Sequence, residues 1–215
     1  MGKDTVDKSQ KTLTDDRTIP AFHPVIRHLE LYGQLSGEDR AFLIDNTERL
    51  DLPRQHIVCT EGNICYHMHF VVSGLLRGHY NKDGRNVTTG FQAEGTIITP
   101  LSSFLNRRAA LFTLETLEPT VLYRMHYDDL RELFRRSHAF EHISREATLA
   151  SLVDLENRLY ALQFYSAQER YENFLVQFPN LINRLSLTHI ASYLGVSLET
   201  LSRVRTNLTN VKPKG

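Results

Sequence analysis

Several common signatures are missing from this chain, and each absence narrows its possible functions. No apolar run approaches the roughly 20 residues that cross a membrane. The first residues, MGKDTVDKSQKTLTDD, contain no apolar signal segment. Only two cysteines occur, so no disulfide framework is required. The formal net charge is zero, which argues against general coating of nucleic acid. We therefore expect a cytoplasmic protein with no membrane partner.

The motifs of the common enzyme classes are also missing. The chain has no glycine-rich phosphate loop, no G-x-S-x-G motif and no paired-carboxylate arrangement. Residues 138–142 read H-x-x-E-H, a zinc-peptidase pattern, but five common residues match it by chance and no third ligand is indicated. Cys65, His67 and His69 alternate along a predicted strand near Cys59, and they would suit zinc or haem iron. A strand with a mixed polar face explains the same spacing, so we expect no catalytic residue, metal or cofactor.

The N-terminal two thirds of the chain predict helices followed by a β-roll. Residues 1–19 are polar and aperiodic, which is typical of a flexible tail. From Pro20 the pattern is helical, and Ser36 is placed to cap a helix that runs through Leu50. Short β-branched and aromatic runs fill residues 54–126, with a hairpin turn at residues 81–84. This spacing predicts an antiparallel barrel or jelly roll, in a sensor domain spanning residues 20–136.

Helical periodicity returns after the strands. A short helix starts at Tyr127, a longer one covers residues 139–163, and another covers residues 167–177. The long helix has an apolar stripe broader than packing on a barrel needs. Such a helix usually pairs with another helix, and the expected partner is its copy in a second subunit. We assign residues 137–165 to a dimerisation helix and residues 166–215 to the last domain.

The stretch at residues 185–208 has the pattern of a helix-turn-helix. Gly195 can take the positive φ that a tight turn demands, and Ser197 can cap the second helix. In such a motif the second helix enters the DNA major groove. An ordinary helical hairpin would share part of this pattern. The DNA-binding candidates are Thr188, Ser197, Glu199, Thr200, Ser202, Arg203 and Arg205.

Charge is distributed unevenly along the chain. From Arg184 onward five cationic residues stand against Glu199 alone, a net charge of +4, so the preceding 183 residues carry about −4. A basic end on a mildly acidic body is expected of a localised DNA contact.

The order of these elements resembles the Crp/Fnr family of bacterial transcription regulators, in the style of its Bacteroidetes branch. Glu61-Gly62 and residues 70–77, FVVSGLLR, are similar to the family's roll signature. Residues 190–203, IASYLGVSLETLSR, are similar to its DNA-reading segment. The resemblance implies an α+β fold: an N-terminal antiparallel β-roll, a long dimerisation helix and a C-terminal helix-turn-helix. It also implies a homodimer on pseudo-palindromic double-stranded DNA, with Glu199 and Arg203 contacting bases and with RNA polymerase as a further partner to test.

The chain departs from the family pattern in two places. It continues only about eleven residues past Val204, so we expect no full β-wing. Members that bind cyclic AMP carry Gly-Glu, then Arg-Ser or Arg-Thr about ten residues later, and here those pairs fall on Thr99-Pro100 and near residues 109–111. We therefore expect no cyclic-nucleotide binding but an unknown small-molecule effector. The candidate effector residues are Thr99, Pro100, Leu101, Arg107, Arg108, Ala109 and Ala110.

Two alternatives stay open. One is a cyclic nucleotide-responsive regulator with an atypical pocket. The other is a ligand-sensing or protein-interaction module that has lost DNA binding. A DNA reader would lose affinity steeply with rising salt, whereas the second alternative would show no DNA binding at all.

Overall fold

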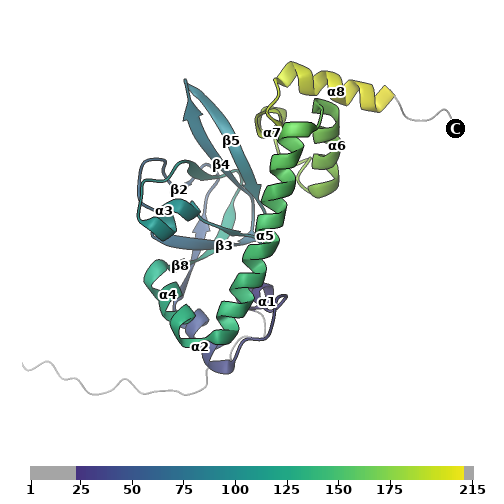
Figure 1. Cartoon of the computed structure of the whole chain (residues 1–215). Coiled ribbons are helices and arrows are strands. Elements are labelled where there is room, and N and C mark those ends of the chain that lie inside the picture. Colours follow the sequence, from purple (N-terminus) through teal and green to yellow (C-terminus); the bar gives the residue numbers. More distant parts are fainter. Residues whose placement is uncertain (1–22, 211–215) are drawn as a thin grey trace, which may run out of the picture.

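The fold is mixed, with a β-roll on one side of a long helix and a small helical module at the far end of that helix (Figure 1). The computed structural model describes residues 23–210. The predicted tail at residues 1–19 lies outside this range. The expected α+β architecture is confirmed, because strands and helices occupy separate stretches of the chain in the predicted order.

Two four-stranded antiparallel sheets form the roll. The first has the order β1 (Thr47–Leu52), β8 (Thr120–His126), β3 (His67–Ser73) and β6 (Ile97–Ile98), and the second has the order β2 (Ile57–Cys59), β7 (Thr113–Thr116), β4 (Leu76–Lys82) and β5 (Arg85–Gln92). A short helix, α3 (Leu101–Asn106), follows β6. Fully buried residues from both sheets fill the space between them: Val71, Leu76, Leu114 and Leu122.

Local turn chemistry places the corners of the roll. Asp83 and Gly84 have φ angles of 53° and 80°, as a two-residue hairpin loop requires, which confirms the predicted β4–β5 turn. Gly74 has φ +100°, and a Cβ there would lie 2.4 Å from Oγ1 of Thr120. Only glycine fits this corner between β3 and β4.

The predicted helix through Leu50 is wrong. The helix α2 (Gly37–Asp45) ends at Asp45, and its cap is the predicted one, with Oγ of Ser36 accepting a hydrogen bond from the Asp39 amide at 3.0 Å. Leu50 instead lies in β1, where its register partner is Leu122 of β8. This segment forms a strand and not a helix because it pairs with β8, some 70 residues later in the chain.

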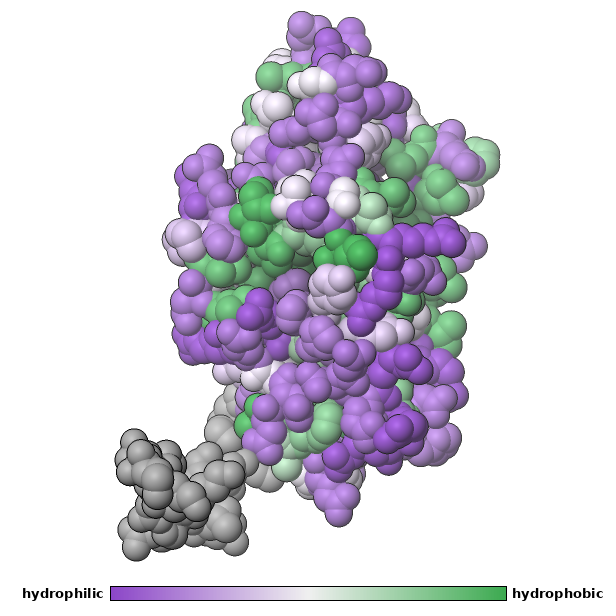
Figure 2. Space-filling view, turned by 90° about the vertical axis from the view of Figure 1, so that its left-hand side faces the viewer, coloured by the Kyte–Doolittle hydropathy of each residue, from purple (hydrophilic) through white to green (hydrophobic). Residues whose placement is uncertain are grey.

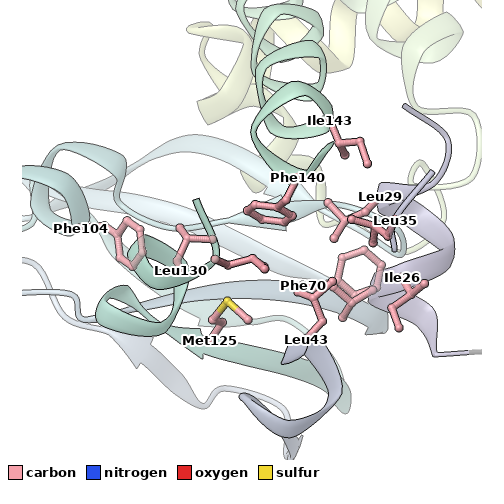
Figure 3. Close-up of a cluster of buried hydrophobic side chains, with 12 residues drawn as sticks. Ile26, Leu29, Leu35, Leu43, Phe70, Phe104, Met125, Leu130, Phe140 and Ile143 are labelled. Atoms are coloured by element: carbon pink, nitrogen blue, oxygen red, sulfur yellow. The ribbon is translucent and has the colours of Figure 1, made fainter. Parts of the chain in front are cut away.

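Helices cover the outer face of the first sheet. The helices are α1 (Pro24–Leu29), α2, α4 (Tyr127–Arg136) and the start of α5 (His138–Phe164). Figure 3 shows Phe70 and Met125 of the sheet meeting Phe140 and Ile143 of α5 in one buried cluster. Ser137 caps α5 and donates a hydrogen bond to Oδ2 of Asp39 at 2.7 Å, which ties α2 to the start of the long helix.

The middle of α5 has little cover from its own chain. Its large apolar side chains there are 42–60% exposed, and they are Leu149, Leu152, Val153, Leu155, Leu159, Tyr160 and Leu162. Four of them, Leu152, Leu155, Leu159 and Leu162, follow a spacing of three, four and three residues, which is the seam pattern of a coiled coil. The apolar stripe of the long helix, which the sequence predicted to be broader than packing on the roll requires, is therefore exposed.

The C-terminal module consists of α6 (Ala167–Gln177), α7 (Leu187–Leu194) and α8 (Leu198–Asn210). The predicted bounds of α6 are confirmed, and a capping box joins Ser166 to Glu169 at its start. Phe174, Ile190 and Leu201 form its core, and Leu75 and Phe91 of the roll belong to the same buried cluster. The module is thus packed directly on the roll.

Polar contacts fix this docking in detail. Oγ of Ser192 on α7 accepts a hydrogen bond from the Thr88 amide of β5 at 2.8 Å. The Arg184 guanidinium pairs with Glu94 at 2.8 Å and also with Glu118, both on the roll. Figure 1 shows the β4–β5 hairpin next to α7, with its tip pointing away from α5.

The two cysteines are joined in a disulfide, Cys59–Cys65. It closes a short loop between β2 and β3. The sequence left the role of these cysteines open, and their pairing removes both thiolates from the metal set considered with His67 and His69. Within residues 23–210, no group of three or more His, Cys, Asp or Glu side chains is placed to hold a metal ion.

Candidate nucleic-acid interface

The helix pair α7–α8 has the local geometry predicted for a helix-turn-helix. Gly195 has φ +68° and its amide bonds to carbonyls of α7, so the chain turns sharply at this residue. Oγ of Ser197 then accepts a hydrogen bond from the Thr200 amide at 3.1 Å and caps α8. Leu201 and Val204 are buried against the module. This packing fixes which face of α8 remains outside.

The outer face of α8 is polar and lies in solvent. Glu199, Ser202 and Arg203 are exposed along it, and Asn207 continues the same stripe. Glu199 and Arg203 are one helical turn apart, so their side chains lie on the same face. No ion pair within residues 23–210 engages either of them. Both are free to meet a partner.

The other DNA-binding candidates have more varied positions. Thr188 is exposed in the first turn of α7. The hydroxyls of Ser197 and Thr200 lie 2.9 Å apart and bond to each other, so they order the start of α8. Arg205 is half-buried and engaged within the chain. The structure brings all seven candidates onto one module, with Glu199, Ser202 and Arg203 forming its most open part.

Arg184 has a different role from the one that the charge count indicated. It contributed to the net positive charge of the C-terminal end, yet its guanidinium is engaged by Glu94 and Glu118. These two bonds raise the pKa of Arg184, and the bond from Arg184 is the main reason that the pKa of Glu94 is lowered. Arg184 therefore holds the module on the roll.

The effector candidates lie around α3, at the edge of the roll. Thr99 is buried and its hydroxyl donates to the His67 carbonyl at 3.0 Å. Pro100 caps α3 and Leu101, its first residue, is 53% exposed. Figure 2 shows hydrophobic residues gathered over the middle of the face that carries α3 and β2.

The arginines after α3 are held away from the interior of the roll. Arg107 has φ 55°, and its guanidinium lies 3.8 Å from the ring centroid of Tyr127 and 4.9 Å from that of Tyr66. Arg108 and Ala109 are exposed, whereas Ala110 is buried and donates its amide to the Asn63 carbonyl. Stacking between two tyrosines fixes the charge of Arg107 against α4.

A further contact within the roll was not visible in the sequence. A Cβ on Gly78 of β4 would lie 2.4 Å from Oγ1 of Thr89 and 3.3 Å from the Phe112 ring. The Phe112 ring therefore covers β4 where the loop after α3 returns to the sheet. Only the fold brings these residues together, because Gly78 and Phe112 are 34 positions apart in the sequence.

Comparisons with known proteins agree with this architecture. Residues 49–137 match the family model of the cyclic nucleotide-binding domain. FixK2 from Bradyrhizobium japonicum is 19% identical, with a TM-score of 0.67 over 76% of this chain and 85% of its own. No curated protein sequence shows a significant match.

Two further solved structures have a similar fold over more than 80% of this chain. The global regulator CLP of Xanthomonas campestris is 19% identical, with a TM-score of 0.64 over 81% of this chain and 92% of its own. The catabolite activator protein of Thermus thermophilus is 21% identical, with a TM-score of 0.52 over 84% and 86% of the two chains. The chain has the fold of the Crp/Fnr transcription regulators.

This result confirms the predicted Crp/Fnr resemblance at the level of the fold. The Bacteroidetes-type branch stays a prediction, and so does the missing β-wing, because residues 211–215 lie outside the described range. No helix among the described residues is long and apolar enough to cross a membrane.

Proposed function

We propose that the chain is a sequence-specific DNA-binding transcription regulator of the Crp/Fnr type. The observation that carries the proposal is the outer face of α8, where Glu199 and Arg203 are exposed on a helix whose opposite face is buried. Arginine can donate two hydrogen bonds to guanine O6 and N7, and glutamate can accept one from cytosine N4. Arg203 and Glu199 are the proposed base readers.

The remaining candidates support this contact. Thr188 and Ser202 are exposed and small enough for phosphate or sugar contacts. Ser197 and Thr200 order the first turn of α8, whose N-terminus favours a nearby phosphate. Arg205 lies on a less open side of α8 and adds positive charge near the backbone.

The proposed assembly is a homodimer joined along α5. Its exposed seam at Leu152, Leu155, Leu159 and Leu162 would be covered by the same seam of a second copy. A two-fold dimer places two copies of α8 on half-sites about one helical turn of DNA apart. The expected operator is therefore pseudo-palindromic.

The proposed effector is a small molecule other than cyclic AMP. The positions that align with the nucleotide-binding pairs carry neither a free carboxylate nor a guanidinium: Thr99 bonds to the His67 carbonyl and Ala110 has no polar side chain. Arg107, which is half-buried next to α3, is stacked on Tyr127 and Tyr66. Losing charge-assisted hydrogen bonds of about 1.5–3 kcal/mol each would remove most nucleotide affinity.

Selection of bound duplexes from a random library tests the DNA assignment. We expect an enriched pseudo-palindrome whose binding weakens steeply as salt rises. Arg203→Ala should lose about 1–3 kcal/mol on the selected site and accept substitutions at one base position in each half-site. Arg135→Ala is the matched control, because Arg135 is 79% exposed on α4 outside the module. Equal base preference in wild type and Arg203→Ala would remove Arg203 as a reader, and absence of any enriched duplex would refute the function.

Sedimentation of the free protein tests the dimer. Leu155→Glu places a charge in the seam and should shift the protein to a monomer at micromolar concentration. Leu31→Glu is the control, since Leu31 is 75% exposed outside α5. A dimer that survives Leu155→Glu with unchanged affinity would contradict the proposed seam.

A further inference from the structure

The inner face of the first sheet carries a polar strip at one end. In the antiparallel register His69 of β3 stands opposite Arg124 of β8, and His67 stands opposite His126. Directly paired residues point to the same face of a sheet, as do alternate residues of one strand. Val71 shares this face and is fully buried between the sheets. The strip therefore faces the interior of the roll.

A cavity of about 220 Å³ lies against this strip. Its walls include Arg124, His67 and His69 on one side and the Cys59–Cys65 loop on the other. This volume far exceeds the roughly 10–15 Å³ that a single ordered water occupies. No carboxylate lines the cavity, and the charged group in its lining is the Arg124 guanidinium, whose partner Glu48 lies outside the lining. The lining favours an anion.

His69, in the wall of this cavity, carries a buried polar atom without a hydrogen-bond partner among the described residues. His69 is only 5% exposed, and this burial lowers its pKa to about 4, so the ring is neutral at physiological pH. The ring bonds to the backbone of Ile98, while Nδ1 has no hydrogen-bond partner among the described residues. Buried polar atoms are nearly always paired. With the ring proton directed to the Ile98 carbonyl, Nδ1 is an acceptor that a ligand hydroxyl or amino group would satisfy.

Arg124 is available to such a ligand. Its Nε and Nη2 atoms both bond to one oxygen of Glu48, at 2.8 and 2.6 Å. The Glu48 side chain is 60% exposed, and solvent-exposed ion pairs contribute little stability. The planar guanidinium matches a carboxylate in geometry. Arg124 can therefore bind a ligand carboxylate in addition to Glu48 or in place of Glu48.

We propose that this cavity binds a small carboxylate that also carries a hydroxyl or amino group. The carboxylate pairs with Arg124 beside His67, and the hydroxyl or amino group donates to Nδ1 of His69. The site is separate from the effector residues predicted by family resemblance, because none of them lines it. Binding does not depend on the proposed DNA-reading function and is measured without DNA.

The walls of the cavity are tied to the helices around it. Oγ of Ser103 on α3 accepts a hydrogen bond from the Cys65 amide at 2.9 Å. The Tyr66 carbonyl accepts one from the Tyr127 amide at the start of α4, and the His67 carbonyl accepts one from Thr99. A ligand that orders residues 65–67 therefore stiffens the attachments of α3 and α4. This consequence, unlike binding itself, rests on the proposed regulator function.

Calorimetric titration of the full chain with matched probes tests the site. The probes are malate and glutamate, their counterparts succinate and glutarate without the hydroxyl or amino group, and inorganic phosphate. We expect at least one of malate and glutamate to bind, with its counterpart about tenfold weaker because Nδ1 of His69 then stays unpaired. Phosphate binding as tight as the best carboxylate would overturn the assigned ligand class. Failure of all five probes to bind at millimolar concentration would overturn the site.

Variants locate the binding. Arg124→Gln should abolish it, and Arg135→Gln, outside the cavity, should leave it unchanged. Unaltered binding by Arg124→Gln would place the ligand elsewhere and refute the assignment. Should Arg124→Gln fail to fold, the imidazole resonances of His67 and His69 in the wild-type protein decide the point. These imidazole resonances should shift during titration with malate or glutamate if the ligand occupies the cavity. Resonances that do not shift would contradict the proposed site.

Discussion

Replacing Arg184 by alanine should weaken the docking of the C-terminal module on the roll without unfolding either part. Nη1 and Nη2 of Arg184 donate to the two oxygens of Glu94 at 3.0 and 2.8 Å, a bidentate pair. The same guanidinium also bonds to Glu118. These are charged contacts between the module and the roll, whereas the cores on either side do not include Arg184.

The expected loss follows from the exposure of the three side chains. They are 26%, 44% and 32% exposed, so the ion pairs lie between the fully exposed and buried cases. A well-placed exposed pair contributes up to about 1 kcal/mol, and bidentate geometry puts these pairs at the upper end of that range. Removing both pairs should cost about 1.5 kcal/mol, a change of about tenfold in the docking equilibrium.

Hydrogen exchange at one amide reports the docking directly. The Thr88 amide of β5 donates to Oγ of Ser192 on α7, so it is protected only while the module is docked. We expect its exchange to become about tenfold faster in Arg184→Ala. Arg40→Ala is the matched control, since Arg40 pairs with Glu30 at 2.6 Å within the helices that flank the roll. Unchanged exchange in Arg184→Ala, or equal acceleration in the control, would refute the docking role.

Three further predictions concern the roll and its contacts. Gly74→Ala should destabilise the fold by about 3 kcal/mol in urea titration, because its Cβ would meet Thr120, whereas Gly37→Ala, with nothing within 4 Å, should be neutral. Cys59→Ser should cost about 2 kcal/mol of unfolding free energy in oxidising buffer, from the short closed loop, and nothing in excess reductant. Docking of the module should weaken in acid, because the pKa of Glu94 is lower in the folded protein than in the unfolded chain. The Glu94 carboxylate therefore stabilises docking fully at pH values above its unfolded pKa, and this stabilisation is lost as the pH falls through its folded pKa. Glu94→Gln should flatten this dependence in the exchange assay.

Elements with local signals could be predicted from the sequence. The turn at Gly195 and the cap at Ser197 are set by one backbone angle and one hydroxyl, so their pattern is visible within a few residues. The same holds for the β4–β5 turn at residues 83–84. The long helix was predicted within one residue at each end, because its apolar period persists over more than twenty positions.

Features that depend on distant partners could not be predicted. Leu50 was placed in a helix because nothing nearby shows that β8 would pair with it. His67 and His69 were noticed as an alternating pair, but their partner Arg124 lies more than fifty residues away, and the disulfide that lines the same cavity was not foreseen. The charge of Arg184 was counted correctly and assigned to the wrong partner, since sequence alone does not show which acidic groups face it.

Arg158 connects these distant parts within a single turn of α5. Its guanidinium donates to the Thr89 carbonyl of β5 and lies 4.3 Å from the ring centroid of Tyr193 on α7. It stands directly before Leu159 of the proposed dimer seam, so one turn of α5 contacts the roll and the C-terminal module and, in the proposed dimer, would also contact the second subunit. A shift of β5 relative to α5 must either break the Arg158 contact with Thr89 or move the stacked Tyr193 with it. Tyr193 also packs on Phe91 and Phe174. Such a shift therefore changes how α7 packs on the roll, and with it the direction in which α8 faces.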